Sequence, residues 1–126
     1  MKRLHDTEFE VMMGLWRNET PISTSALRDH LEKERPWNLS PLQTVLSRLE
    51  AKGLVRSEIK KHNRYFVPLI TEKEYLESES KTFFGRFGGK GLTDLVAGMY
   101  DSESITKDDL KELMEYIRSK TDEDNL

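Results

Sequence analysis

The chain has 126 residues, of which 34% are charged and 36% hydrophobic, with a net charge of −3 and no cysteine. This length suits one domain or a small domain with an appendage, and the lack of cysteine excludes disulfides and thiolate chemistry. No apolar run approaches the roughly 20 residues of a membrane span, and the N-terminus lacks a signal-peptide core, so we expect a cytoplasmic protein without a membrane partner.

The charge is distributed unevenly along the chain. Residues 35–64 hold seven basic and two acidic residues, whereas residues 71–126 hold 8 basic and 14 acidic ones. A basic centre beside an acidic C-terminal half predicts that one part of the chain contacts a polyanion and the other does not.

The first helix is predicted over residues 6–18. Asp6 or Thr7 can cap it, since Thr7 and Glu10 have the spacing of a capping box. After the break at residues 20–21, Ile22 is expected to add a short strand. The first helix carries an apolar stripe that is more typical of a protein core than of a cofactor site: Phe9, Met12, Met13 and Trp16, widened by Val11 and Leu15.

A second helix follows, with Ser23 or Thr24 as its cap. Its inward residues are predicted to be Leu27 and Leu31. The polar connection after it contains one large apolar residue, Trp37, which we expect to anchor this loop to the core.

The third helix is predicted over residues 40–53, SPLQTVLSRLEAKG, because both of its ends are encoded locally. Ser40 is the predicted cap, with Gln43 at capping-box spacing and Pro41 at the first helical position. Gly53 suits the left-handed residue that ends a helix. One face is apolar and is expected to face the core: Leu42, Val45, Leu46 and Leu49.

The opposite face of this helix is polar and basic. Such a helix, roughly 18 Å long, fits along a DNA major groove, where Gln can bind adenine and Ser or Thr can bind bases or phosphates. Arg48 lies one position off the groove-facing side and is expected to contact a phosphate, and Lys52 is also predicted to bind DNA. For the helix alone, an ordinary amphipathic surface helix remains the better explanation. The residues predicted to face the groove are Ser40, Gln43, Thr44 and Ser47.

After Gly53 the pattern becomes strand-like. Residues 54–60 and 64–69 are predicted strands joined by the turn KHN, and Pro68 places the second strand at the sheet edge. Three helices followed by a hairpin with a basic tip predict a winged helix-turn-helix with a two- or three-stranded wing, over residues 1–70. The tip of this hairpin is suited to phosphate or minor-groove contact through Lys60, Lys61, His62, Asn63 and Arg64. The alternative is a turn that only adds solubility.

Residues 71–126 are predicted to be helical. Thr71 with Glu74 and Thr106 with Asp109 have capping-box spacing. An apolar stripe comprises Leu76, Phe83, Phe84 and Phe87. The glycines at 85, 88, 89 and 91 mark a break. Residues 121–126 are acidic and expected to be frayed. The overall fold class is mostly α (α+β).

The helices of this C-terminal region carry more apolar residues than their small size can cover. A tail folded back on its own chain is the alternative, but the pattern favours a homodimer formed through this region. The predicted dimer residues are Leu92, Leu95, Val96, Met99, Leu110, Leu113, Met114 and Ile117.

Support for catalysis is weak. The glycines near residue 90 lie between helices and lack the spacing of a phosphate-binding loop. The three histidines, His5, His30 and His62, fall in different predicted elements. We therefore expect no enzyme activity, no cofactor and no metal site.

Four stretches, TEFEVMMGLW, LQTVLSRLEAKGLV, RYFVPLI and SKTFFGRF with LTDLV, resemble the penicillinase-repressor family (BlaI/MecI/CopY type) over nearly the whole chain. The resemblance implies a homodimeric repressor with an N-terminal winged helix, a C-terminal dimerisation region and a palindromic double-stranded DNA operator. Members repress β-lactamase, penicillin-binding-protein or copper-export operons.

The chain departs from this family at two places. It lacks the cysteines of copper-responsive members, so that mode of regulation is not supported. β-Lactam-responsive members are cleaved by a sensor protease at an Asn-Phe bond, and the matching position is Gly98-Met99. A sequence-specific repressor, with a sensor protease as a partner, is the expected function. The alternative is a winged helix that contacts only other proteins.

Overall fold

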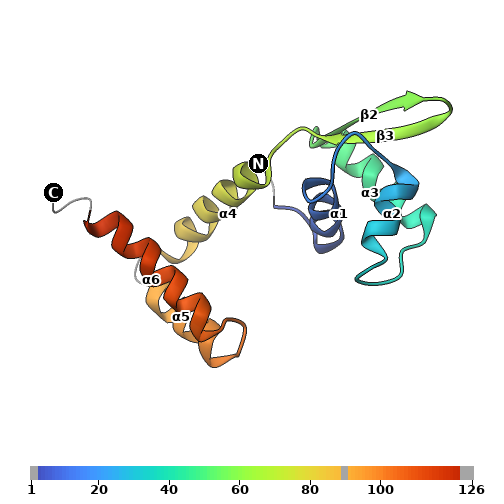
Figure 1. The fold of residues 1–126 in the computed structure, drawn as a ribbon. Helices are drawn as coiled ribbons and strands as arrows, with labels where there is room; N and C mark the ends of the chain where they lie inside the picture. Colours follow the sequence, from blue (N-terminus) through green and yellow to red (C-terminus); the bar gives the residue numbers. More distant parts are fainter. Residues whose placement is uncertain (1–2, 89–90, 123–126) are drawn as a thin grey trace. The chain divides into compact units, whose positions relative to one another are not determined.

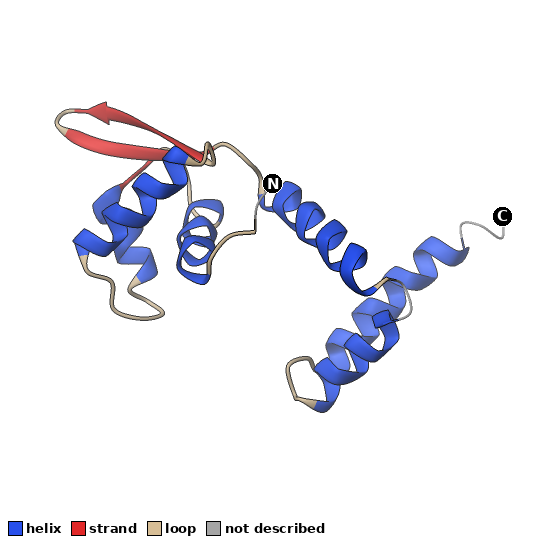
Figure 2. Cartoon of the chain, turned by 180° about the vertical axis from the view of Figure 1, so that it is seen from behind, coloured by secondary structure: helices blue, strands red, loops and turns tan. Residues whose placement is uncertain are grey.

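The computed structural model describes residues 3–88 and 91–122. It divides into two compact units, Met1–Lys81 and Thr82–Leu126. The elements, labelled in Figure 1, are α1 (Asp6–Trp16), β1 (Ile22–Ser23), α2 (Thr24–Leu31), α3 (Leu39–Ala51), β2 (Val55–Lys60), β3 (Asn63–Pro68), α4 (Glu72–Phe87), α5 (Leu92–Asp101) and α6 (Lys107–Asp122). The predicted class, mostly helical with a small sheet, is confirmed (Figure 2). The boundary between the two units falls inside α4, eleven residues after the predicted end of the first domain at residue 70.

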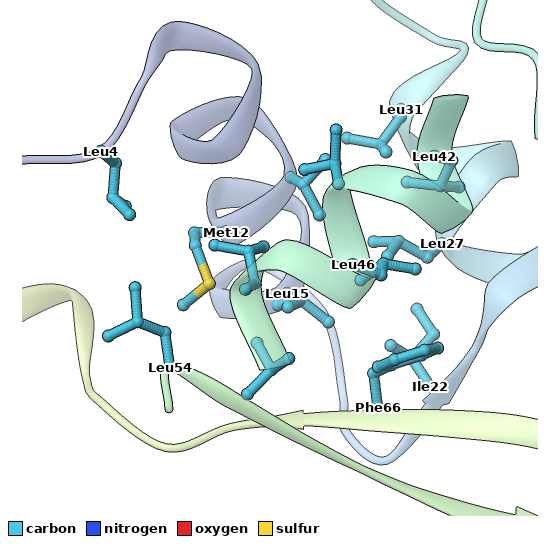
Figure 3. Close-up of a cluster of buried hydrophobic side chains, with 14 of the residues drawn as sticks. Leu4, Met12, Leu15, Ile22, Leu27, Leu31, Leu42, Leu46, Leu54 and Phe66 are labelled. Carbon is cyan, nitrogen blue, oxygen red and sulfur yellow. The ribbon is translucent and has the colours of Figure 1, made fainter. Parts of the chain in front are cut away.

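The core of the first unit lies where α1, α2 and α3 meet the sheet. Figure 3 shows Leu27 and Leu46 side by side in this core, with Phe66 of the sheet next to Ile22. The predicted apolar face of α3 and the predicted inward residues of α2 are buried, as is Trp37. The predicted stripe of α1 is only partly right. Phe9 is exposed, because Val11, Met12 and Leu15 occupy the core side instead.

Helix α1 begins at the predicted residue, Asp6, and ends two residues sooner than predicted. Its cap is His5, whose backbone N–H donates to the Glu8 carboxylate at 3.0 Å. The predicted Thr7–Glu10 box does not form, because the Glu10 carboxylate instead binds Arg35 and the Trp37 indole N–H.

Helix α3 begins slightly earlier than predicted, with Asn38 as its cap, so Ser40 is a helical residue. Its end agrees with the prediction. Gly53 has φ +78°. The Leu54 N–H donates to the Leu49 backbone carbonyl, and the Gly53 N–H donates to the Glu50 backbone carbonyl. This is a Schellman motif, which only a residue tolerant of the left-handed region allows at low cost.

The sheet has the antiparallel order β1-β3-β2. The second predicted strand is therefore central, and the prediction of an edge strand from Pro68 is wrong. The reason is that β1 pairs only with Tyr65 and Phe66, so Pro68 lies beyond the reach of β1. Lys61 and His62 both have positive φ and form the two-residue turn between Lys60 and Asn63.

The two predicted capping boxes of the C-terminal region are confirmed at α4 and α6. Helix α4 continues through Gly85, so the predicted break is wrong at that residue, and the helix ends before Gly88, with φ +67°. Gly89 lies outside the described residues. Thr121 belongs to α6, and residues 123–126 of the predicted frayed end are not described.

Candidate nucleic-acid interface

The polar face of α3 is continuous and open to solvent. Spacing of three and four residues places its members on one side of the helix, opposite the buried leucines. The Thr44 hydroxyl donates to the Ser40 carbonyl at 3.1 Å, whereas no hydrogen bond engages the Gln43 amide within the described part of the chain. A shallow hollow runs along this face, lined by Ser40, Gln43, Thr44, Ser47, Arg48 and Ala51.

The start of α3 is held by the loop before it. The Trp37 indole N–H donates to Glu10 at 2.9 Å, the Trp37 carbonyl accepts from Arg28 at 2.9 Å, and the Arg35 guanidinium lies 4.3 Å from the Trp37 ring centre. Sequence reasoning placed Trp37 in the core but missed the charged residues around it. Because these partners come from α1 and α2, the start of α3 is tied to both preceding helices.

The hairpin carries exposed cations at and near its turn. Of these, Lys61 occupies the turn itself, next to the imidazole of His62. Lys60 lies 3.4 Å and Arg56 3.5 Å from the Glu58 carboxylate. Exposed pairs of this kind contribute little, so a phosphate can replace Glu58 as their partner.

A hydrogen-bonded relay joins α3 to the wing. Glu50 accepts from the Ser57 hydroxyl at 2.6 Å and from the Ser57 N–H at 3.1 Å. Arg64 donates to the same Ser57 hydroxyl at 2.8 Å. The predicted wing residue Arg64 is thus linked through β2 to the helix that carries Gln43. Glu50 is a functional candidate that the sequence pattern did not single out.

Lys52 does not belong to this polar face in the structure. Its ammonium lies 2.7 and 2.9 Å from the two oxygens of Glu8, a residue that is only 1% exposed. Burial acts to raise the pKa of Glu8, but hydrogen bonds from Lys52 and the His5 N–H outweigh burial and hold that pKa below its ordinary value of 4.5. Lys52 is therefore the partner of a buried carboxylate, and its contact with DNA stays a prediction.

The second unit holds the eight predicted dimer residues on α5 and α6. None of the described residues of these helices is buried within the chain. Leu92, Met114 and Ile117 are among the exposed apolar side chains. The Gly98-Met99 bond lies inside α5.

Residues 3–88 and 91–122 support neither a metal site nor a membrane-spanning helix. No group of three or more His, Asp or Glu residues there could hold a metal ion. No helix of that part is long and apolar enough to cross a membrane.

Comparisons with known proteins agree with this geometry. The profile of the family described as "Penicillinase repressor" matches residues 4–119. The penicillinase repressor of Bacillus licheniformis is 30% identical over 117 residues, which cover 91% of this chain and 89% of that protein. The methicillin resistance regulatory protein MecI of Mammaliicoccus sciuri is 25% identical over 119 residues, covering 93% of this chain and 94% of that protein.

A solved structure matches the first part of the fold. The solution structure of the DNA-binding domain of the repressor BlaI is 31% identical to this chain, with a TM-score of 0.51. The match covers 60% of this chain and 94% of that domain. The predicted winged helix is thereby confirmed.

Proposed function

Since the chain belongs to the penicillinase-repressor family, we propose that it is a sequence-specific DNA-binding repressor of an antibiotic-resistance or related operon, acting as a homodimer on an inverted-repeat operator. The observation that carries the proposal is the open polar face of α3, beside a wing with exposed cations. The second helix of a helix-turn-helix enters the major groove with such residues toward the base edges.

Within this proposal the residues have distinct roles. Gln43, with its amide free, reads bases, and Ser40, Thr44 and Ser47 contact bases or phosphates along the same groove. Arg48 binds phosphate. The wing residues Lys60, Lys61, His62, Asn63 and Arg64 contact the backbone or the minor groove next to the helix.

The homodimer is supported by the second unit, where apolar side chains of α5 and α6 are left open to solvent. A second copy of this region would cover them, as expected for a symmetric interface. We also propose that a sensor protease cutting the second unit would induce the operon, because it would separate the DNA-binding units from one another.

The proposal is tested by selecting binding sites from a pool of random DNA duplexes with the full chain. We expect an enriched inverted repeat. Gln43→Ala should lose roughly 1–3 kcal/mol of binding free energy on that repeat and far less on random DNA, because only the repeat presents the base edge that Gln43 reads. Binding to both DNAs is measured by fluorescence anisotropy.

The matched control is Glu77→Ala, which removes an exposed polar side chain from α4, outside the polar face of α3. Its binding to both DNAs should equal that of the unmodified chain. Failure to enrich any sequence would favour the alternative, a winged helix that contacts proteins only. An equal loss on both DNAs for Gln43→Ala would assign this face to positioning and not to sequence reading.

A further inference from the structure

The wing cation Arg64 is held by a serine, and the direction of each hydrogen bond follows from the chemistry of the partners. An ionised carboxylate can only accept a hydrogen bond, and a guanidinium can only donate one. The Ser57 hydroxyl therefore donates to Glu50 Oε2 at 2.6 Å and accepts from Arg64 Nη1 at 2.8 Å. Both bonds involve a charged group, which makes them stronger than bonds between neutral groups. The hydroxyl is thus fixed in one direction by its two partners.

The register of the hairpin places this link on the side of the wing that faces the helices. Ser57 lies opposite Phe66, and Ile59 lies opposite Arg64, so these four side chains share one face of the sheet. Phe66 is 4% exposed and belongs to the core, which identifies this face as the one toward the helices. Arg64 continues the same face beyond the core, where it is exposed. The guanidinium is therefore held on the α3 side of the wing.

The link is anchored twice on α3. Besides the hydroxyl bond, Glu50 Oε2 accepts the Ser57 backbone N–H at 3.1 Å. This backbone bond does not depend on the side chain at position 57, so it can hold β2 to α3 when the hydroxyl is removed. The attachment of the wing and the placement of Arg64 can therefore be separated by substitution.

Arg64 keeps its charge available for DNA. No ion pair within the described part of the chain neutralises it, and a guanidinium has five N–H groups, of which the bond to Ser57 uses one. Ordering a long side chain at an interface weakens binding, unless the side chain is already ordered in the free protein. Because Ser57 holds Arg64 before DNA arrives, much of this ordering takes place on folding.

We propose that Ser57 is a positioning residue that orients Arg64 toward a DNA phosphate before the DNA binds. This inference rests on the proposed function, because it requires the wing to contact DNA. Ser57 acts through Arg64. Since Ser57 also binds Glu50, the phosphate contact of the wing is placed relative to the helix that reads the base edges.

The test is a double-mutant cycle of Ser57→Ala and Arg64→Ala in the full chain. Affinity is measured by fluorescence anisotropy on a short random duplex, since a phosphate contact carries no sequence information. Ser57→Ala alone should weaken binding about 2- to 10-fold, the effect of ordering one long side chain at an interface. In the Arg64→Ala background it should change affinity by less than about 2-fold, because the group that it orients is gone. Arg64→Ala should itself lower the salt slope by about 1.

A rescue variant and a control accompany the cycle. Ser57→Thr keeps the hydroxyl and suits a strand, so it should bind DNA like the unmodified chain. Ser80→Ala removes an exposed hydroxyl whose bond to the Leu76 carbonyl stays within α4, and it should leave affinity unchanged.

A second measurement needs no DNA. NMR relaxation of the Arg64 side-chain N–H reports motion on the picosecond to nanosecond timescale. This motion should increase in Ser57→Ala and stay at the level of the unmodified chain in Ser57→Thr.

Three results would overturn the inference and leave the proposed function in place. Ser57→Ala could weaken binding equally in both backgrounds, which would make Ser57 a support of the whole wing. It could leave affinity unchanged although Arg64→Ala weakens binding, or leave the motion of Arg64 unchanged. If Arg64→Ala alters neither affinity nor salt slope, the inference fails together with the proposed role of Arg64 in the wing. Enrichment of an inverted repeat would still support base reading by α3.

Discussion

At the scale of single residues, Lys52 shows how a side chain of the expected chemistry can serve another purpose. It follows the last turn of α3, where a cation near DNA is expected to bind phosphate. Its ammonium instead neutralises Glu8, whose carboxylate also accepts the N–H at the start of α1. Removing one partner of a buried pair leaves a charge without compensation, which costs more than the pair itself contributes.

We predict that Lys52→Met lowers the free energy of unfolding by about 1–3 kcal/mol at pH 7, a value reduced from that of a fully buried pair because the lysine side chain is 36% exposed. The folded pKa of Glu8 is depressed, so the pair stabilises the fold above the unfolded pKa and its contribution is lost as the pH falls through the folded pKa. The difference in the free energy of unfolding between the variant and the unmodified chain should therefore become smaller below about pH 4.5. Urea unfolding across pH measures it.

The same variant tests whether Lys52 contacts DNA. Lys52→Met should leave the dependence of DNA affinity on salt unchanged, whereas Arg48→Met should lower the slope of log affinity against log salt by about 1. A lower slope for Lys52→Met would return Lys52 to the phosphate contacts.

At the scale of elements, the hairpin is a rigid extension of the core and not a free loop. Register from Val55–Pro68 to Lys60–Asn63 is continuous, and the Glu50–Ser57–Arg64 relay ties the hairpin to α3. The cations near the turn are therefore displayed at a set distance from the polar face of α3. Charges held in this way release counterions from DNA when they reach its phosphates.

The triple variant with alanine at Lys60, Lys61 and Arg64 should bind operator and random DNA more weakly alike. It should lower the salt slope by about 3, because each of these cations would neutralise one phosphate and so account for about 1 of the slope. Anisotropy titrations at several salt concentrations give the slope. Alanine at Lys73 and Lys81, both exposed on α4, removes positive charge elsewhere and should leave the slope nearly unchanged. A triple variant with an unaltered slope would exclude the wing from the interface.

At the scale of the whole molecule, the two units have different kinds of core. Among the residues that the structure describes, the first encloses sixteen buried apolar ones. The described parts of α5 and α6 contain none, although they carry Leu113, Met114 and Ile117 at helical spacing. The first unit is thus expected to fold alone, and the second to require a partner surface.

A chain truncated after Lys81 should stay folded, sediment as a monomer and bind the full inverted repeat weakly, because it loses the effective-concentration gain of linkage, typically 10²–10⁴ in affinity. It would also represent the product of the proposed cleavage. Truncation after Ile70 should be less stable, since it removes Tyr75 from Phe9 and Trp16. Analytical ultracentrifugation and gel shifts measure association and binding.

Point variants test the same interface without removing chain. Leu113→Asp or Val96→Asp places a charge in the proposed apolar contact and should yield monomers that bind like the truncated chain. Lys111→Asp introduces the same side chain at an exposed site on α6 outside the apolar stripe and should leave the dimer intact. A dimeric truncated chain, or one that binds the full repeat as tightly as the full chain, would contradict the assignment of the dimer to the second unit.

What the sequence by itself determined about this protein is local: the caps at Thr71 and Thr106, the left-handed Gly53, the buried face of α3 and the hairpin after it. These features depend on residues a few positions apart, whose spacing within one helix or strand is set by backbone geometry. The resemblance of four short stretches added the family, which the comparisons confirmed.

What only the tertiary structure decided depends on partners far apart in the chain. Lys52 meets Glu8 across 44 residues, and Leu4 meets Tyr75 across 71. β1 joins the far side of β3 and makes it central. No periodicity encodes such pairs, because whether a cation reaches phosphate or a buried carboxylate depends on which surfaces the packed core brings together.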